Sequence, residues 1–319
     1  MSVVADTRER VREAGLLAAD HPVIVMLSGG RDSTCLLDVA VSLCGAGAVT
    51  ALHVNYGLRA GADGDEQHCT ELCAALGVEL SVKRARRPLA GNLQAWAREV
   101  RYDAAALLAL SRAADIAAGH TASDQVETVL YRLASSPSRR ALLGMRPREG
   151  NIVRPLLGVT REQTTAYCRE RGLAWRDDES NASDAYARGR IRHGVVPALR
   201  EVHPAAEANV LTLVENLRAE AEVLDEIVEA ELAGRAEIRL RRLRALPVAL
   251  ARLIVQRLAD GVAGRPTPGA GRRLDDLLAL RETGTAHLDL PGGVRATVTE
   301  GMLRFDRTPE ITREPYTGA

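Results

Sequence analysis

Short apolar segments alternate with segments of helical periodicity through the first 134 residues of this 319-residue chain. The expected strands are 23–28, Val49–Val54, Val78–Val82 and Asp115–Ala118, and the expected helices are 32–44, 64–76, 91–113 and 123–134. Strands separated by helices pair in parallel, and the helices cover both faces of the sheet. The pattern therefore predicts an α/β fold with a doubly wound parallel sheet, in which ligands bind at the carboxyl ends of the strands.

The first strand runs directly into the loop Ser28-Gly29-Gly30-Arg31-Asp32-Ser33, and a helix follows. Two glycines let the backbone N–H groups approach an anion, and the helix directs its positive end at the same point. Ser28 and Ser33 add hydroxyl donors, whereas Asp32 would repel a bare phosphate and so favours a metal-bound polyphosphate or a role in holding the loop. The Gly-Gly pair alone is equally compatible with a tight turn that binds nothing, but its strand and helix context predicts a nucleotide site.

Two further polar segments follow expected strands, at His53–Arg59 and Gly119–Thr128, and should meet the loop in one crevice. Asp124 and Glu127 are three residues apart, so they share one face of a helix. Two such carboxylates can hold a metal, bind a substrate ammonium or accept a proton from an attacking amine. The alternative for the pair alone is a solvated acidic surface.

The loop resembles the SGGxDS pyrophosphate loop of the ATP pyrophosphatase (PP-loop) superfamily, whose members transfer AMP from ATP to an oxygen of their substrate. Within it, the chain resembles the tRNA(Ile)-lysidine synthetase family over roughly residues 20–200. The motifs that carry this resemblance are an HxNxxLR-like segment at His53–Arg59, an ARxxRY-like segment at Ala97–Tyr102, a GHxxxDxxET-like segment at Gly119–Thr128, Arg154–Leu157, Arg161, Trp175, Asp178–Asn181 and Arg188–His193. Ser123 departs from the family aspartate, Gly189 from the family asparagine, and 134–138 from a Gly-rich stretch.

The resemblance implies an adenine nucleotide alpha hydrolase-like PP-loop domain that binds ATP and Mg²⁺. ATP is expected to contact Ser28, Gly29, Gly30, Arg31, Asp32, Ser33, His53 and His120. Asp32 and Asp124 are expected to share the metal, and the expected catalytic residues are Asp32, Asp124, Glu127 and Arg101. Arg59, Arg98, Arg154, Arg188, Arg190 and Arg192 are expected to contact tRNA or lysine.

The same resemblance implies a ligase that acts in tRNA processing. The C2 carbonyl oxygen of the wobble cytidine in a CAU-anticodon tRNA(Ile) would attack the α-phosphate of ATP, and the ε-amino group of L-lysine would then displace AMP to give lysidine. Asp124 or Glu127 would bind the lysine ammonium and Arg101 its carboxylate. Whether Asp124, Glu127 or water takes the proton stays open at this point.

The alternation of strands and helices does not continue beyond about residue 200. We therefore expect a catalytic domain at 1–204 and a tRNA-binding domain at 205–319. Apolar residues from Val210 to Val228 alternate in steps of four and three, which favours a helix of a small helical domain over the seam of a homodimer. A terminal β-hairpin is expected at His287–Val298, with its turn at Pro291–Gly293, and a third strand at Met302–Phe305.

The zero net charge of the chain hides a local asymmetry. Residues 215–231 hold seven acidic side chains and one arginine, whereas 235–257 hold seven arginines and one glutamate. A basic stretch of this kind suits a polyanion such as tRNA, although the two stretches could also neutralise each other. An aromatic content of 3% disfavours recognition by serial base stacking, so phosphate contacts should dominate.

Composition limits the alternatives. The N-terminal residues do not have the pattern of a signal peptide, and no apolar run is long enough to cross a membrane. We therefore expect a cytoplasmic protein with no membrane partner. Five cysteines at irregular spacing include no C-x-x-C, which disfavours a thiouridine- or thiocytidine-forming enzyme. An amide ligase of the GMP, NAD or asparagine synthetase type would carry a glutaminase-like segment, and none is visible in this sequence. A non-catalytic nucleotide- or RNA-binding module would tolerate losses in the loop, whereas Ser28–Ser33 is intact.

Overall fold

The computed structural model describes residues 2–58, 61–86, 88, 91–136, 138–176 and 186–309. The chain forms two compact units, Met1–Leu217 and Arg218–Ala319. Their division falls inside the helix α9, Ala206–Leu232, because Val210 and Leu211 at its start pack on a small cluster of the first unit. The functional division at residue 204 stays a prediction.

The first unit contains a six-stranded sheet with the strand order β3-β2-β1-β4-β6-β5. All neighbouring strands pair in parallel except β5 and β6, which are antiparallel. The doubly wound parallel sheet is therefore confirmed. The strands are β1 (Val23–Met26), β2 (Val49–Asn55), β3 (Glu79–Arg84), β4 (Asp115–Ala117), β5 (Arg148–Glu149) and β6 (Ile152–Val153).

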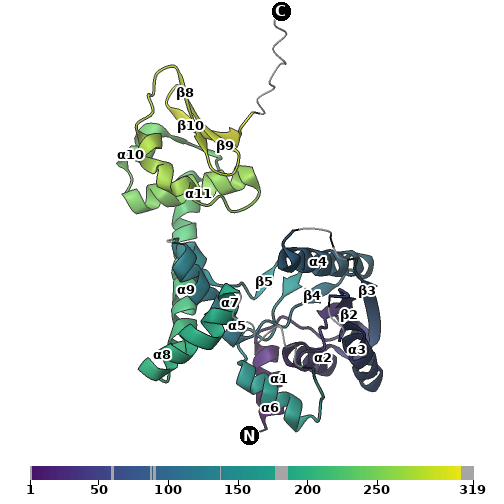
Figure 1. The fold of residues 1–319 in the computed structure, drawn as a ribbon. Helices are drawn as coiled ribbons and strands as arrows, with labels where there is room; N and C mark the ends of the chain where they lie inside the picture. The colour runs from purple at the N-terminus through teal and green to yellow at the C-terminus, as the bar shows by residue number, and fades with distance from the viewer. Residues whose placement is uncertain are drawn as a thin grey trace, which may run out of the picture. The chain divides into compact units, whose positions relative to one another are not determined.

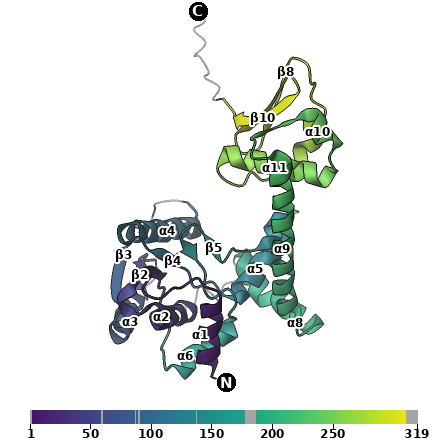
Figure 2. The same ribbon diagram turned by 180° about the vertical axis from the view of Figure 1, so that it is seen from behind.

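Helices cover both faces of this sheet (Figures 1 and 2). Val23 and Val25 of β1 join the core on the side of α1, α2, α3 and α6, whereas Ile24 and Met26 face α4. This alternation follows from the period of two in a strand, and it requires apolar residues at every position of β1. The helices are α1 (Val3–Glu13), α2 (Arg31–Cys44), α3 (Ala62–Leu76), α4 (Leu93–Arg112), α5 (Ala122–Ser135), α6 (Arg161–Glu170), α7 (Ala187–Arg190) and α8 (Val196–Val202).

The strand order fixes where a ligand site can form. After β1 the chain passes through α2 to β2 and β3 on one side, and α4 then carries it back to β4 on the other side of β1. The carboxyl ends of β1 and β4 therefore flank a crevice at the point where the strand order reverses, which is the usual ligand position in such sheets.

The second unit contains an antiparallel sheet with the order β7-β10-β9-β8. The predicted hairpin is present, since Leu290 pairs with Val294 across the turn, and the third strand follows as β10. Its elements are β7 (Glu237–Arg239), α10 (Leu240–Ala245), α11 (Val248–Ala263), α12 (Leu274–Leu278), β8 (Thr285–Leu290), β9 (Val294–Thr299) and β10 (Met302–Arg307). Fully buried leucines from α10 and α12 pack with β9 and β10 in its core.

The charge asymmetry of this unit is partly internal. Arg242 pairs with Glu231 at 2.7 Å, and Arg257 pairs with Glu229 at 2.6 Å. These pairs join the basic stretch to the acidic stretch of α9, so only part of the basic charge remains for a partner. Among the described helices, none is both long and apolar enough to span a membrane.

Candidate active site

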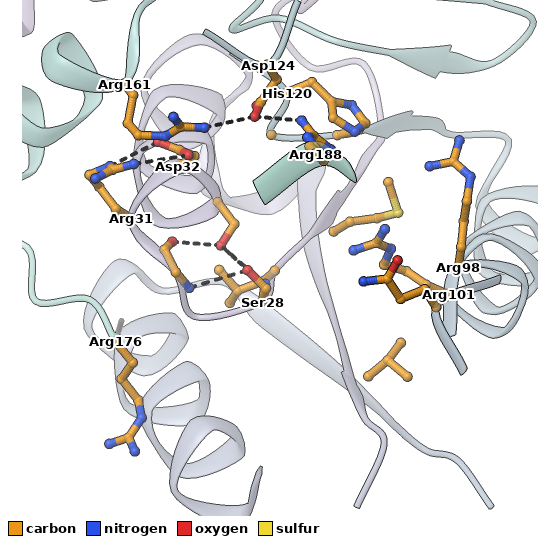
Figure 3. A pocket seen from close by; sticks show the side chains of 18 of the residues that line it. Ser28, Arg31, Asp32, Arg98, Arg101, His120, Asp124, Arg161, Arg176 and Arg188 are labelled. Carbon is orange, nitrogen blue, oxygen red and sulfur yellow. Dashed lines mark hydrogen bonds and ion pairs between the residues drawn. The ribbon is translucent and has the colours of Figure 1, made fainter. Parts of the chain in front are cut away.

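A cavity of about 590 Å³ opens at the carboxyl ends of β1, β2 and β4. Ser28–Ser33 and the segment from Gly119 to Asp124 contribute to its wall, and Arg98 and Arg101 reach it from α4. In Figure 3, Arg98 and Arg101 lie to one side, whereas Asp32 and Arg161 lie to the other. Seven arginines but only two carboxylates line the cavity among the described residues, so its electrostatic character suits anions.

The loop after β1 is held by its own serines. Ser33 Oγ donates to the Gly30 carbonyl at 2.8 Å and accepts from the Ser28 N–H at 3.2 Å. Gly29 has a φ of +81°, which favours glycine, and a Cβ there would also lie only 3.2 Å from the sulfur of Cys69. No described side chain caps α2, whose N-cap is Gly30, and its first N–H groups are therefore free to face an anion.

The segment after β4 packs directly on the start of α2. A Cβ at Gly119 would lie 3.4 Å from the backbone of Asp32 and Ser33. The neighbouring helix α5 then begins with a capping box, in which Thr121 Oγ1 accepts from the Asp124 N–H and Asp124 Oδ2 accepts from the Thr121 N–H at 2.8 Å. This local bond fixes the position of the Asp124 side chain in the cavity wall.

Asp32 is held by α6. The hydroxyl of Thr164 donates to Asp32 Oδ1 at 2.5 Å, and Arg31 Nε donates to the same oxygen at 3.1 Å. The Asp32 side chain is 23% exposed and lines the cavity, so part of the carboxylate remains accessible.

Asp124 and Glu127 form the most highly charged part of the site, because three arginines bind these two carboxylates. Arg161 and Arg188 donate to Asp124 Oδ1 at 3.0 and 2.8 Å. Glu127 accepts from Arg188 Nε at 2.8 Å and from Arg192 Nε at 2.7 Å. The carboxylate side chains are 9% and 2% exposed, whereas Arg188 is 51% exposed.

Burial alone would raise the pKa of both carboxyl groups. At Asp124 the charges of Arg188 and Arg161 and the hydrogen bond from the Thr121 N–H together outweigh burial, so the pKa of Asp124 lies below its ordinary value. At Glu127 the hydrogen bonds from Arg192 and Arg188, together with the charges of Arg188 and Arg161, lower the pKa in the same way. Both groups are therefore ionised at neutral pH. Arg188 and Arg192 can both reach Glu127 because they are four residues apart on a continuous helical stretch whose second half, Ile191–Val195, is a π-helical turn.

His120 and Arg101 present polar atoms without partners. His120 Nδ1 and Arg101 Nε are buried and have no hydrogen-bond partner among the described residues. Burial, together with the charges of Arg154, Arg188 and Arg101, outweighs the opposing effect of Asp124 and lowers the pKa of His120 to about 4. His120 is therefore neutral at neutral pH, and both side chains line a cavity in which a ligand could satisfy them.

Other predicted residues lie elsewhere. His53 is 4% exposed and lies behind the loop, where its Nδ1 is 3.0 Å from the Leu27 carbonyl oxygen. Arg154 is 4% exposed and donates to the Arg146 carbonyl, so its side chain has almost no surface to offer an RNA phosphate. Arg190 is exposed on α7. Arg59 and the predicted segment Asp178–Asn181 lie outside the described residues.

Three further residues contribute to the site without having been predicted for it. Arg161 binds both carboxylates, Thr164 binds Asp32, and Arg176 lines the cavity and donates to Asp65 at 2.6 Å. The sequence did indicate Arg161, because this residue is among those that carry the family resemblance. No sequence motif indicated Thr164 or Arg176.

Comparison with known proteins agrees with this geometry. The profile of the PP-loop domain family matches residues 5–199. The U34-tRNA thiolase NcsA from Methanococcus maripaludis has the same fold, with a TM-score of 0.57 over 67% of this chain and 78% of its own, at 16% identity. The chain thus contains a PP-loop domain, the class of ATP-binding domain that the loop sequence indicates.

Curated relatives narrow the family. A tRNA(Ile)-lysidine synthase from Symbiobacterium thermophilum is 35% identical over 97% of this chain and 70% of its own length. The one from Gloeobacter violaceus is 37% identical over 81% of this chain and 83% of its own. The chain belongs to the tRNA(Ile)-lysidine synthase family. It spans half the length of the relative from Pseudomonas fluorescens, which is 37% identical over 68% of this chain.

Proposed function

We propose that this chain joins lysine to the wobble cytidine of a CAU-anticodon tRNA(Ile), using ATP. The observation that carries the proposal is the meeting of an uncapped phosphate loop and the Asp124 carboxylate in one arginine-rich cavity. The sequence relatives named above support the choice of substrate.

The loop Gly29–Ser33 would bind the phosphates of ATP through the N–H groups at the start of α2. The donor set also fits Mg²⁺, which prefers one or two carboxylates together with phosphate oxygens, because Asp32 and Asp124 both line the cavity. No group of three metal-ligating side chains occurs among the described residues, so the ion would arrive with the nucleotide. When bound, Mg²⁺ would neutralise charge on the phosphates.

The chemistry needs two displacements. The cytidine O2 attacks the α-phosphorus, the bond from that phosphorus to the bridging oxygen breaks, and pyrophosphate leaves. The lysine ε-ammonium then gives up one proton, the resulting amine attacks C2, the C2–O bond breaks, AMP leaves with that oxygen, and the nitrogen loses a second proton. Both steps depend on positioning and charge neutralisation, which the arginines that line the cavity can supply.

Lysine would be held at both ends. Asp124 or Glu127 would bind its ammonium, and Arg101 would bind its carboxylate through the nitrogen that lacks a partner in the described chain. His120, neutral at the working pH, would serve as a hydrogen-bonding group for the nucleotide rather than as a cation. Asp124, Glu127 and water all remain candidates for the proton acceptor.

The RNA would be gripped mainly through phosphates. Arg98, Arg188 and Arg190 are exposed, and Arg192 is 24% exposed. The region 205–319 would add the basic residues of 235–257 that α9 does not neutralise. If this is correct, log K for tRNA should fall with log salt by roughly 0.7 to 0.9 per phosphate contact.

The test is incubation of the chain with ATP, labelled lysine and tRNA transcripts. Lysine-dependent label should enter CAU-anticodon tRNA(Ile) but not tRNA(Met), with one AMP released per lysine. Asp32→Asn should abolish the labelling, and Asp115→Asn, which alters a carboxylate that pairs with Arg148 outside the cavity, should not. Absence of label in tRNA(Ile) with the unaltered chain would refute the proposal.

The cysteines do not favour thiolation. All five are buried, and burial raises the pKa of Cys69 to about 12 and that of Cys73 to about 11. Sulfur transfer needs an accessible thiolate. The buried thiols therefore favour attack by an amine, for which Asp124 and Glu127 would provide a binding site.

A further inference from the structure

Arg188 belongs to a different sequence motif from Asp124 and Glu127, yet its side chain binds both carboxylates. Its Nη2 donates to Asp124 Oδ1 and its Nε to Glu127 Oε2, both at 2.8 Å. The two carboxylates are the proposed partners of the lysine ammonium, whereas Arg188 itself is a proposed partner of RNA phosphate. Figure 3 shows the Arg188 side chain extending to Asp124 in the cavity.

A lysine ammonium cannot simply join this cluster. Three guanidinium groups already neutralise two carboxylates with one positive charge to spare, and the carboxylates are 9% and 2% exposed. A further cation among them would be repelled strongly in a buried environment. An ammonium that replaces one guanidinium leaves the charge of the cluster unchanged.

Arg188 is the guanidinium best placed to leave. Its side chain is 51% exposed, compared with 22% for Arg161 and 24% for Arg192. Arg161 is also fixed at the first turn of α6, where a capping box from Thr160 and Gln163 holds the backbone. A guanidinium binds phosphate and carboxylate with the same forked geometry, so a phosphate near Arg188 offers it an equivalent partner.

We propose that Arg188 occupies the place of the substrate ammonium on Asp124 and Glu127 until an RNA phosphate draws it away. This inference rests on the proposed function. RNA and lysine then favour the same state of one side chain, so each ligand tightens the binding of the other, and by the same factor. The arrangement keeps the lysine subsite closed to amines while no RNA is bound.

The test measures the binding of radiolabelled lysine to the full chain by equilibrium dialysis, with and without an anticodon stem-loop RNA that carries CAU. Without RNA, Arg188→Gln should bind lysine about 5- to 150-fold more tightly than the unaltered chain, the usual range of such coupling. RNA should tighten lysine binding to the unaltered chain but not to Arg188→Gln.

Arg200→Gln is the matched control. The Arg200 side chain is 49% exposed and also pairs with two carboxylates, Glu162 and Glu207, but it does not line the cavity. This variant should bind lysine as the unaltered chain does and should keep the response to RNA. In the reciprocal measurement, saturating lysine should tighten RNA binding to the unaltered chain by the factor found for lysine.

Arg188→Lys provides a second variant in case Arg188→Gln does not fold. A lysine side chain keeps the charge but not the fork, so its lysine affinity without RNA should fall between those of the other two proteins.

The possible failures are distinguishable. If folded Arg188→Gln binds lysine no more tightly than the unaltered chain in the absence of RNA, this inference is wrong, and lysine-dependent labelling of tRNA would still support the proposed function. If the unaltered chain neither binds lysine in the presence of RNA nor labels tRNA, the proposed function and the inference are both wrong.

Discussion

Two clusters of arginine and carboxylate in the first unit look alike but lie in different surroundings. In one, Asp38 of α2 binds Arg8, Arg171 and the hydroxyl of Tyr167. In the other, Asp124 and Glu127 bind Arg161, Arg188 and Arg192. Every carboxylate in both is less than a tenth exposed, and each cluster carries one excess positive charge. Only the second lies at the wall of the cavity.

The pKa values do not separate the clusters either. Burial would raise the pKa of Asp38, but hydrogen bonds from Arg171, Tyr167 and Arg8 outweigh it and lower that pKa, as Arg188 and Arg192 do in the other cluster. Perturbed carboxyl groups therefore mark structural and functional sites alike. What differs is access, because a ligand can replace an arginine only where the cluster meets a cavity.

The largest expected effect is at Asp38. Asp38→Ala leaves two arginines and the fully buried Tyr167 without their shared acceptor, and α1 and α6 lose a bond to α2. Breaking a buried pair of this kind costs about 3 to 5 kcal/mol of unfolding free energy, and we expect the lower end because both arginines are partly exposed. Urea unfolding measures the loss, and lysine affinity of the folded fraction should not change.

Asp124→Asn should have the opposite profile. The amide oxygen can keep the capping bond to Thr121, but the amide NH2 group then replaces the oxygen that accepts from Arg161 and Arg188. Unfolding free energy should therefore fall, but by less than the roughly 3 to 5 kcal/mol of a broken buried pair, because Glu127 still binds both arginines. Lysine affinity in the presence of RNA should fall at least about tenfold, or roughly 1.4 kcal/mol, because the ammonium loses an ionic partner. Equilibrium dialysis measures it. A large stability loss with unchanged lysine affinity would make this cluster a second structural one.

The sequence predicted most of the fold for a clear reason. The strand β1 is an uninterrupted apolar run and β2 is largely apolar, and both lie between helices, a pattern that has few other solutions. The strands β5 and β6 were missed because two residues each are too few for periodicity. The edge strand β3 ends two residues later than predicted, in exposed charged residues that carry no apolar signal.

The site was predicted where its residues are contiguous in sequence. The Ser28–Ser33 loop and the pair Asp124 and Glu127 line or support the cavity as expected. Arg188 and Arg192 were predicted as contacts of tRNA or lysine, and Arg161 belongs to the ordered motifs, but nothing in the sequence indicated that these arginines pair with Asp124 and Glu127. Thr164, which binds Asp32 from a distant helix, carried no signal. The position of a residue in a motif does not show whether its side chain is buried. His53 and Arg154 were therefore expected to contact ligands, although both side chains are buried.

Acid should weaken the Asp38 cluster. Because the pKa of folded Asp38 lies below its ordinary value of 3.8, its bonds stabilise the fold above that value, and the contribution is lost as pH falls through the folded pKa. Unfolding free energy should therefore drop below about pH 4, and Asp38→Asn should reduce the drop. Asp124 and Glu127 contribute with the same sign, so some acid sensitivity should persist in this variant. An unchanged acid profile would contradict the role given to Asp38.

The smallest expected effect compares a hydroxyl of the Asp38 cluster with one that binds Asp32 at the cavity. Tyr167 donates to Asp38 and Thr164 donates to Asp32, both at 2.5 Å, and both residues are fully buried. Tyr167→Phe and Thr164→Val should each cost about 1 kcal/mol of unfolding free energy, the net value of one hydrogen bond. Only Thr164→Val should also weaken ATP binding, by a few-fold, because it frees a carboxylate beside the phosphate loop. Equal ATP affinity in the two variants would contradict the distinction between Asp38, which does not line the cavity, and Asp32, which does.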